Sequence, residues 1–481
     1  MSLAGEPASL NPNLRLEAGP DELALIIGQN LFSKLISLTA DGTILPDLAT
    51  RWEESHDGLQ YTFHLRDGVR WHDGRPLTAE DVRATLTRVR DESSNRDLAA
   101  HIASADVLDE RTIRVQLRSR WAAFIPSLAW YGAAILPAHV YASAAWRDHP
   151  ANVQPIGTGP FRFKEWDRGR RIVLEKNDDY YGPGPYVDSL EYLIVPSPEA
   201  GVPMLLDGRV DLLLSRPAPD RVHELSRTQG IRVTTAPGDG RMYIGFNLRN
   251  PVFADLRVRR AVSLAIDRRA LVDRALFGLG APAVGFYTPA VTWAYNGAAR
   301  APQFDPSAAR RLFQAALPAS FSATLVAPGT SSMRYVTEEI ARQLRDAGLP
   351  VNIALTGPRE YFKRLMDAHD FDLALMSGSQ GPDPDNMSTR FSSGGSQQFM
   401  GYASPQLDAL LSRGAAQTDI LVRTQAYHRA QELLAADLPI VPLSESVRVS
   451  VCRERLRGLP SEDARGLVPD FTFNLVRLRP R

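Results

Sequence analysis

The sequence predicts a mixed α/β protein built from two or three domains. Its 481 residues are more than one ordinary hydrophobic core organises. Strand patterns, such as the apolar and polar alternation over 59–66, recur between segments with helical spacing, such as 421–436. The apolar fraction of 44% and the charged fraction of 23% are ordinary for a globular chain. These observations together favour an α/β architecture.

The first element of substance is a helix expected from Asp21 to Leu35. It follows a short strand and an irregular stretch over 10–19. Asp21 and Glu22 place two acids in the first helical turn, where they favour the positive end of the helix dipole. A helix start is therefore predicted at this point.

Residues 46–120 carry the strongest strand and turn signals. Thr78 stands three residues before Asp81, which is the spacing of a capping box, and this sets the start of a helix. In chain order we expect a strand over 59–66, Asp-Gly turns at 67–68 and 73–74, a helix over 79–89 and a hairpin joining 107–108 to 113–117.

The remainder of the chain alternates strands and helices. The segment 157–160 opens a strand. Further strands are expected over 243–248, 323–327, 351–355 and 371–376, helices over 256–276, 335–347 and 421–436, and short final strands after 439–443. The sequence has no internal repeat and no low-complexity tract.

Composition excludes several classes of function. A formal net charge of +0 and a pI of about 7.2 argue against nucleic-acid binding. With Cys452 as its one cysteine, the chain forms no internal disulfide and no multi-cysteine metal site. No apolar stretch approaches the roughly 18 residues of a membrane span. The start at Met1 lacks a hydrophobic export core, so we expect either a cytoplasmic protein or one whose signal peptide has been removed.

Enzyme signatures are missing from the sequence. It has no G-x-S-x-G, H-E-x-x-H, P-loop, G-x-G-x-x-G or C-x-x-C motif. His64 and His72 are expected in packing or surface positions, with metal ligation disfavoured. We therefore expect no catalysis, no cofactor and no bound metal.

One long segment resembles a known family. It reads Pro46-Asp47-Leu48-Ala49, then Trp52, Asp57-Gly58 and an unbroken run from Tyr61 to Val82 that includes Asp67-Gly68-Val69-Arg70-Trp71-His72-Asp73-Gly74. It resembles the solute-binding proteins of peptide/nickel-type ABC importers. Later segments resemble the same family in the same order, at 155–161, 177–182, 245–267, 381–386 and 401–411.

The resemblance implies a two-lobed periplasmic-binding-protein fold, of type II, with an extra subdomain on the first lobe. The first lobe would comprise 1–43, 154–239 and 442–481, the extra subdomain 44–153, and the second lobe 240–441. The chain would cross between lobes near 236–244 and 438–445, and the solute would bind between them.

The resemblance also implies partners. A monomer outside the cytoplasm, periplasmic or lipid-anchored, would capture a peptide-like or other polar organic solute. It would deliver the solute to a membrane permease served by an ATPase. A role in presenting bound ligand to a receptor is the alternative from another class, and adjacent permease and ATPase genes would decide for transport.

In the first lobe, two groups of residues are candidate solute contacts. Arg15, Glu17, Ala18 and Gly19 match in position a loop that lines the cleft of relatives. Arg15 would answer a ligand anion and Glu17 a ligand cation, and solvated charge is the plain alternative. Trp130 and Tyr131 follow a helix-like segment, and they would either face the cleft or pack internally.

In the second lobe, the expected contacts come from several loops and strand ends. Trp293 and Tyr295 stand in a loop where aromatic rings serve equally as ligand walls or as packing. The remaining candidates are Tyr243, Ser377, Gly378, Ser379, Gln380, Asp383, Asn386, Arg390 and Tyr402. For Asp383 a structural turn and helix cap is favoured over a pocket-edge role, and catalysis by the Asp383–Asp385 pair is least favoured.

The family pattern fails at two places. Dipeptide-binding relatives hold the peptide ammonium with an aspartate just before the D-P-D-N run, where this chain has Ser379 or Gln380. They hold the carboxylate with an arginine that is absent from 325–330. A buried charge without a partner costs several kcal/mol. A free dipeptide is therefore disfavoured, and longer peptides, opine-like or sugar conjugates and metal chelates stay open, with Arg390, Trp293 and Tyr402 as contacts for a chelate.

Overall fold

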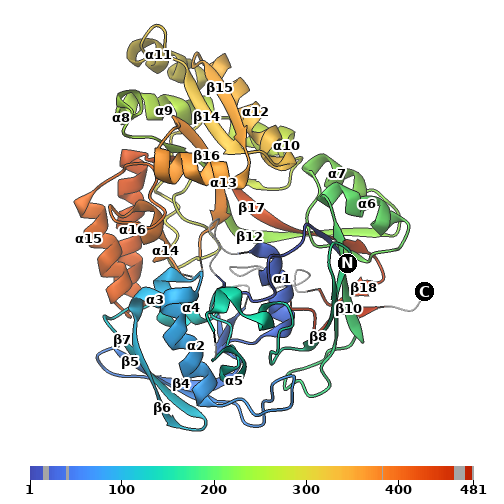
Figure 1. Cartoon of the computed structure of the whole chain (residues 1–481). Helices are drawn as coiled ribbons and strands as arrows, with labels where there is room; N and C mark the ends of the chain where they lie inside the picture. The colour runs from blue at the N-terminus through green and yellow to red at the C-terminus, as the bar shows by residue number, and fades with distance from the viewer. Residues whose placement is uncertain (15–20, 40–42, 143, 382, 460–471, 479–481) are drawn as a thin grey trace. The chain divides into compact units, whose positions relative to one another are not determined.

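The chain divides into two compact units in a computed structural model (Figure 1). The structure describes all residues except 15–20, 40–42, 143, 382, 460–471 and 479–481. Unit 1 comprises 1–217, 224–236 and 449–481, and unit 2 comprises 218–223 and 237–448. Strand β12 (Ile231–Phe246) begins in unit 1 and ends in unit 2, and β17 (Ile440–Arg453) returns. The subdomain limits expected at 44–153 stay a prediction.

Unit 1 contains two sheets of functional interest. One runs β8-β9-β10-β1-β11 and continues to the last part of β17, and the other runs β4-β5-β7-β6. The elements are β1 (Ser2–Ala4), α1 (Glu22–Leu31), β2 (Ile36–Leu38), β3 (Ile44–Pro46), β4 (Ala49–Glu54), β5 (Gln60–Leu65), α2 (Ala79–Glu92), α3 (Arg96–His101), β6 (Ile102–Asp109), β7 (Thr112–Leu117), α4 (Phe124–Leu128), α5 (Ala138–Tyr141), β8 (Phe161–Asp167), β9 (Arg171–Lys176), β10 (Ser189–Val195), α6 (Pro198–Leu206), β11 (Leu212–Leu213), β18 (Leu456–Arg457) and β19 (Arg477–Leu478).

Helix α1 begins as predicted and ends four residues earlier than expected. Asp21 caps it by accepting hydrogen bonds from the Leu23 and Ala24 backbone N–H groups at 3.0 and 3.2 Å. At the other end the Gly159 N–H donates to Leu31 O at 2.9 Å. A Cβ on Gly157 would lie 1.7 Å from the same oxygen, so only glycine fits there. This approach of a distant loop closes the helix.

The predicted capping box is confirmed. It lies in the Pro46–Val82 segment that resembles the known family, called the recognition segment below. The Thr78 N–H donates to Asp81 Oδ2 at 2.9 Å, at the start of α2. Asp81 Oδ1 also accepts from the Ala138 N–H at 2.8 Å. Both Asp-Gly turns form, with Gly68 and Gly74 at φ of 70° and 86°. The segment is therefore a scaffold of local structure.

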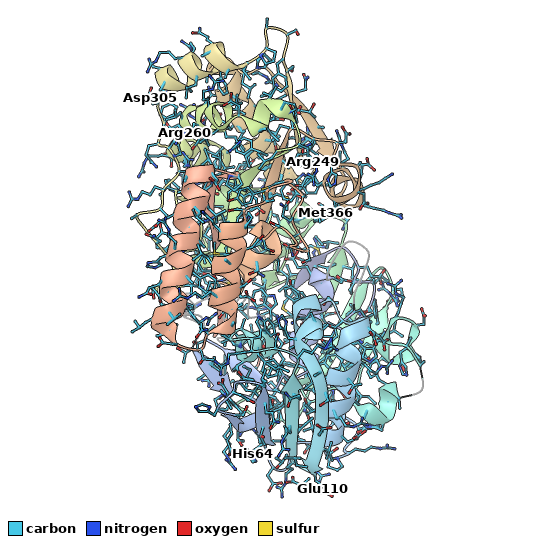
Figure 2. All side chains as sticks on the ribbon, turned by 90° about the vertical axis from the view of Figure 1, so that its left-hand side faces the viewer. His64, Glu110, Arg249, Arg260, Asp305 and Met366 are labelled. Carbon is cyan, nitrogen blue, oxygen red and sulfur yellow. The ribbon has the colours of Figure 1, made fainter. Side chains whose placement is uncertain are left out.

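The two histidines of that segment have structural roles. The His72 ring accepts from the Gly157 N–H at 3.1 Å through Nδ1 and lies 3.1 Å from Gly159 O through Nε2. Burial lowers the pKa of His72 to about 4, so the ring is neutral. His64 lies near Glu110 in the region of the four-stranded sheet (Figure 2), with its Nε2 3.3 Å from Glu53 Oε1. The expected packing and surface roles are confirmed.

Unit 2 is built on the sheet β15-β14-β16-β12-β17, and helices pack against it around one buried apolar cluster. A short helix, α7 (Pro219–Leu225), spans the division between the units. The other elements of unit 2 are α8 (Pro251–Ala254), α9 (Leu256–Ala265), α10 (Arg268–Ala275), β13 (Ala281–Pro282), α11 (Pro306–Ala316), β14 (Ala323–Pro328), α12 (Ser331–Asp346), β15 (Val351–Thr356), α13 (Pro358–Phe362), a π-helical turn (Lys363–Ala368), β16 (Leu373–Ser379), α14 (Asn386–Phe391), α15 (Pro405–Ala416) and α16 (Ile420–Asp437).

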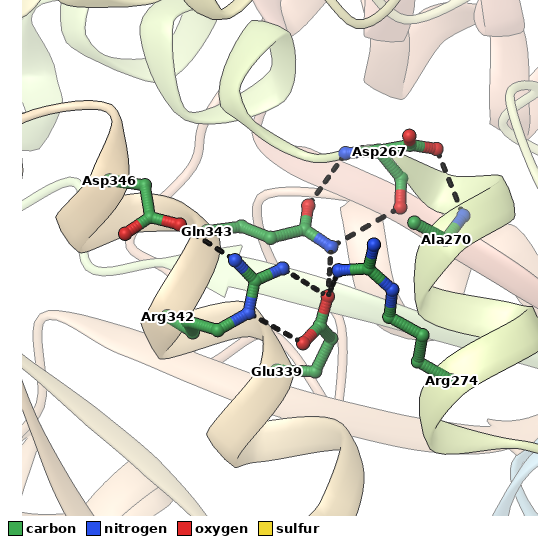
Figure 3. Close-up of polar contacts among 7 residues, drawn as sticks. All are labelled: Asp267, Ala270, Arg274, Glu339, Arg342, Gln343 and Asp346. Carbon is green, nitrogen blue, oxygen red and sulfur yellow. Dashed lines mark hydrogen bonds and ion pairs between the residues drawn. The ribbon is translucent and has the colours of Figure 1, made fainter.

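The single helix expected over 256–276 is wrong. The chain breaks at Ile266, and α10 starts afresh with Asp267 as its cap, accepting from the Ala270 N–H at 2.9 Å. The Asp267 N–H in turn donates to Gln343 Oε1 of α12 at 2.7 Å (Figure 3). The Asp267 side chain caps the first turn of α10, and Gln343 of α12 accepts the Asp267 backbone N–H. These hydrogen bonds replace those that a continuous helix would make across the break.

Three buried arginines hold the chain where it leads into β17. Arg259 Nη2 donates to Asp437 O at 2.7 Å, and Arg268 Nε donates to Pro442 O at 2.7 Å. Arg241 pairs with Glu445. Burial lowers the pKa of Arg268 to about 10, which leaves it charged at neutral pH. The end of α16 is thus fixed to α9, and β17 is fixed to α10 and β12.

Candidate functional site

The carboxyl end of β16 is the centre of the predicted contacts in unit 2. It pairs antiparallel with β12, which sets Tyr243 opposite Met376 and Arg241 opposite Gly378. Within the described residues, β14 pairs with β16 only as far as Val326 opposite Ala374. Met376–Ser379 therefore have a strand partner on one side.

A tight turn follows this strand end. Gly381 has φ of 81°, and a Cβ there would lie 2.7 Å from Asn386 Cβ, so glycine is required. The Gly381 N–H donates to Ser379 Oγ at 3.0 Å. Ser377 and Gly378 are exposed, whereas Gln380 is buried. The turn carries the chain directly into α14.

Arg390 ties the strand end to α14. Its Nη1 donates to Asn386 Oδ1 at 2.8 Å, one helical turn earlier, and its Nη2 donates to Ser379 O at 2.5 Å. The structure thus brings together three predicted residues. Tyr243 is buried on the neighbouring strand, opposite Met376. Burial raises the pKa of Tyr243, and the charges of Arg390 and Arg241 oppose that rise.

Asp383 forms a buried ion pair with Arg423 of α16. The distance from Arg423 Nη2 to Asp383 Oδ1 is 2.5 Å, and the two side chains are 7% and 6% exposed. Asp383 Oδ1 also accepts from the Asp385 N–H at 2.9 Å, as in an Asp-based turn. Arg423 Nε donates to Gly414 O at 3.0 Å. The turn favoured for Asp383 matches this geometry, but the helix cap does not, because Asp385 stands at the N-cap of α14 and no described side chain caps that helix.

Aromatic rings surround the Arg423 guanidinium. Its carbon lies 5.0 Å from the Trp293 ring centre and 5.6 Å from that of Tyr427. The two rings pack edge to face at 6.1 Å. Burial and the neighbouring Asp383 charge raise the pKa of Tyr427. Trp293 therefore belongs to the packing around the ion pair.

The other predicted residues have different contacts. Tyr295 packs against Gly285, and the Tyr402 hydroxyl donates to Asp437 Oδ2 at 2.6 Å. Trp130 and Tyr131 belong to unit 1, where their rings lie 5.2 Å apart, Trp130 buried and Tyr131 half-buried. Arg15, Glu17, Ala18 and Gly19 lie outside the described residues.

Sequence reasoning missed Arg423, Arg241 and Glu445. A signal existed for Arg423, since Arg423, Tyr427, Ala430 and Leu434 follow helical spacing and share the buried face of α16. An arginine on such a face needs a partner. The pairing of Arg241 with Glu445 had no local signal, because the two residues are 204 positions apart.

The described residues suggest neither a metal centre nor a membrane span. None of their His, Cys, Asp and Glu side chains gather in groups of three or more that would hold a metal ion. None of the described helices is long and apolar enough to cross a membrane.

Comparison with known proteins extends over nearly the whole chain. The E. coli K12 dipeptide-binding protein is 27% identical over 489 residues, covering 94% of this chain and 90% of its own. The H. pylori periplasmic binding protein DppA, solved with the peptide STSA, has a TM-score of 0.85 at 26% identity, covering 99% and 97% of the two chains. AgaA of A. tumefaciens R10, solved with agropinic acid, has a TM-score of 0.83 at 26% identity, covering 100% and 98%.

These similarities confirm the periplasmic-binding-protein fold that the Pro46–Val82 segment indicated. The family model described as bacterial extracellular solute-binding proteins, family 5 Middle, matches residues 43–399. The match includes the recognition segment, the crossing strand β12 and the Ser377–Arg390 cluster. The chain belongs to the family 5 bacterial extracellular solute-binding proteins.

Proposed function

We propose that this protein captures a peptide-like or other polar organic solute outside the cytoplasm and delivers it to the permease and ATPase of an ABC importer. Family membership supports the solute-binding role. A dipeptide-binding relative and a structural neighbour solved with the peptide STSA support a peptide-like solute. The protein acts as a binding component without catalysis of its own.

One observation carries the choice of solute class. Among the residues that the structure describes, Met376–Ser379 have a strand partner on one side, and Ser377 and Gly378 are exposed. An exposed strand end of this kind offers backbone N–H and C=O groups to an extended ligand. A peptide of three or more residues, held through its backbone, matches this chemistry.

The same region argues against a free dipeptide. The position that holds the ammonium in dipeptide-binding relatives is a serine or glutamine here. Asp383, the nearest acid after it, is engaged by Arg423 and buried. A solute ammonium therefore finds no carboxylate offered by Asp383, and burial of an unpaired charge is costly.

An acidic opine is a second candidate solute. AgaA, which matches this chain over 98% of the AgaA length, was solved with agropinic acid. The arginine and serine groups around β16 suit a polar, carboxylate-bearing molecule. A peptide would be held through hydrogen bonds to the β16 backbone, whereas an opine would be held through the side chains around that strand.

Calorimetry and thermal unfolding would test the proposal directly. The probes are the tetrapeptide STSA, agropinic acid and the dipeptide Ala-Ala. We expect STSA or agropinic acid to raise the unfolding temperature by several degrees at saturating concentration, and Ala-Ala to raise it less. Failure of every peptide and opine probe to bind would overturn the proposed function.

A further inference from the structure

The three arginines around the carboxyl end of β16 differ in their partners. Asp383 is paired with Arg423, and Arg241 is paired with Glu445. Arg390 forms no ion pair with any residue that the structure describes, and its two hydrogen-bond acceptors there are neutral oxygens, Asn386 Oδ1 and Ser379 O. Of these three arginines, Arg390 is the one without a carboxylate partner among the described residues.

Arg390 keeps donors in reserve. A guanidinium has five N–H groups in a fixed fork. One group on Nη1 and one on Nη2 are used by Asn386 and Ser379. The side chain is half-buried, so the remaining groups are neither sealed in the core nor fully solvated. Such a fork suits bidentate pairing with a planar oxyanion.

The other acid of this loop is Asp385, and Ser388 is its hydrogen-bond partner. Asp385 accepts a hydrogen bond from Ser388 Oγ at 2.9 Å. Its charge is felt by Tyr427, on the Arg423 side, whereas the charge of Arg390 is felt by Tyr243. The Asp385 carboxylate thus accepts from Ser388, whereas Arg390 donates to Asn386 and Ser379.

From these contacts we infer that the solute carries an anionic group, a carboxylate or another oxyanion, and that Arg390 binds it beside Ser379. This rests on the proposed function and narrows its substrate class. Asn386 is the positioning residue, since its side chain holds the guanidinium one helical turn away. The site accordingly selects acidic solutes where dipeptide-binding relatives select an ammonium.

The test compares matched acidic and neutral probes. N-acetylated tetrapeptides Ac-Ser-Asp-Ser-Ala-NH2 and Ac-Ser-Asn-Ser-Ala-NH2 differ by one charge, and agropinic acid is compared with its amide. Calorimetry on the full chain should show at least one acidic probe binding about tenfold or more tightly than its neutral partner. Raising the salt concentration should weaken the acidic probe selectively.

Three variants make the residue assignment falsifiable. Arg390→Gln should abolish the preference for the acidic probe, and Ser379→Asp should abolish it with the arginine still present. Arg345→Gln, which also removes an arginine bonded to a carbonyl in unit 2, should preserve the preference. Circular dichroism and urea unfolding confirm that each variant is folded.

The outcomes separate this inference from the proposed function. Tight binding of neutral probes without an acidic preference would overturn the anionic solute and leave the importer role standing. An acidic preference that survives in both Arg390→Gln and Ser379→Asp would overturn the role of Arg390. Binding of no probe at all would overturn the inference together with the function on which it rests.

Discussion

Arg241 of β12 forms an ion pair with Glu445 of β17 inside unit 2, and the arginine side chain is 1% exposed. Arg241 also donates to Gly285 O at 2.7 Å and to Tyr287 O. The pair joins the two strands that connect the units, near the points where each crosses. Its electrostatics therefore bear on the stability of this part of the fold.

The first prediction concerns pH and Glu445. Burial raises its pKa above the ordinary 4.5, although Arg241 opposes the rise. A folded-state pKa above the unfolded value means that the folded protein holds the proton more tightly. Its contribution is fully present below pH 4.5 and is lost as the pH rises through the raised pKa. Glu445→Gln should remove this fall, as measured by urea unfolding at several pH values.

Glu338→Gln is the matched control for that experiment, because Glu338 is exposed in the same unit. It should leave the pH dependence of the unfolding free energy unchanged. An equal decline with pH in the wild type and in Glu445→Gln would contradict the assignment to Glu445.

The second prediction concerns the Asp383–Arg423 pair. Arg423→Met should cost about 3–5 kcal/mol of unfolding free energy, because it leaves a buried carboxylate without its partner. The double variant Asp383→Asn with Arg423→Met should recover a large part of that loss, since neither charge remains. A double-mutant cycle from denaturant unfolding measures the coupling. Additive effects of the two single changes would show that the pair is not coupled.

The third prediction concerns His72. Burial lowers its pKa from 6.5 to about 4. A depressed folded-state pKa contributes stability that is present above pH 6.5 and is lost as the pH falls towards 4. The shift corresponds to no more than about 3 kcal/mol. His72→Gln should flatten the acid side of the stability curve, and the exposed His56→Gln should not. An unchanged acid limb in His72→Gln would rule this out.

The fourth prediction concerns the glycine loop on α1. Gly157→Ala should prevent folding or destabilise the protein by more than about 4 kcal/mol, because its Cβ would lie 1.7 Å from a backbone oxygen, that of Leu31. Gly394→Ala is the control, since no atom lies within 4 Å of its added Cβ. Expression yield and thermal unfolding compare them. A folded Gly157→Ala with wild-type stability would refute the close approach.

Local features of the fold were predictable from sequence, and long-range ones were not. The Thr78–Asp81 box, the Asp-Gly turns and the Asp21 cap each depend on residues within a few positions. The break at Ile266 was missed because apolar periodicity continues across it, and the group that receives the Asp267 backbone is on α12. Whether a polar residue caps a new helix or lies within one is decided by such tertiary contacts.

The candidate site shows the same limit. The sequence named Ser379, Asn386 and Arg390 among the candidate contacts, and the structure joins these three. It left the role of Asp383 open, because the arginine that pairs with it is 40 residues away on another helix. That Asp383 is engaged by Arg423, while Arg390 bonds to neutral oxygens, is visible only in the structure.

The buried arginines near the start of β17 differ in how their contacts respond to pH. Arg259 and Arg268 donate hydrogen bonds to the backbone oxygens of Asp437 and Pro442, which do not titrate. Guanidinium groups keep their charge throughout the acid and neutral pH range. The hydrogen bonds of Arg259 and Arg268 therefore hold equally in acid and neutral solution, and of the three partners only the Glu445 carboxyl group titrates.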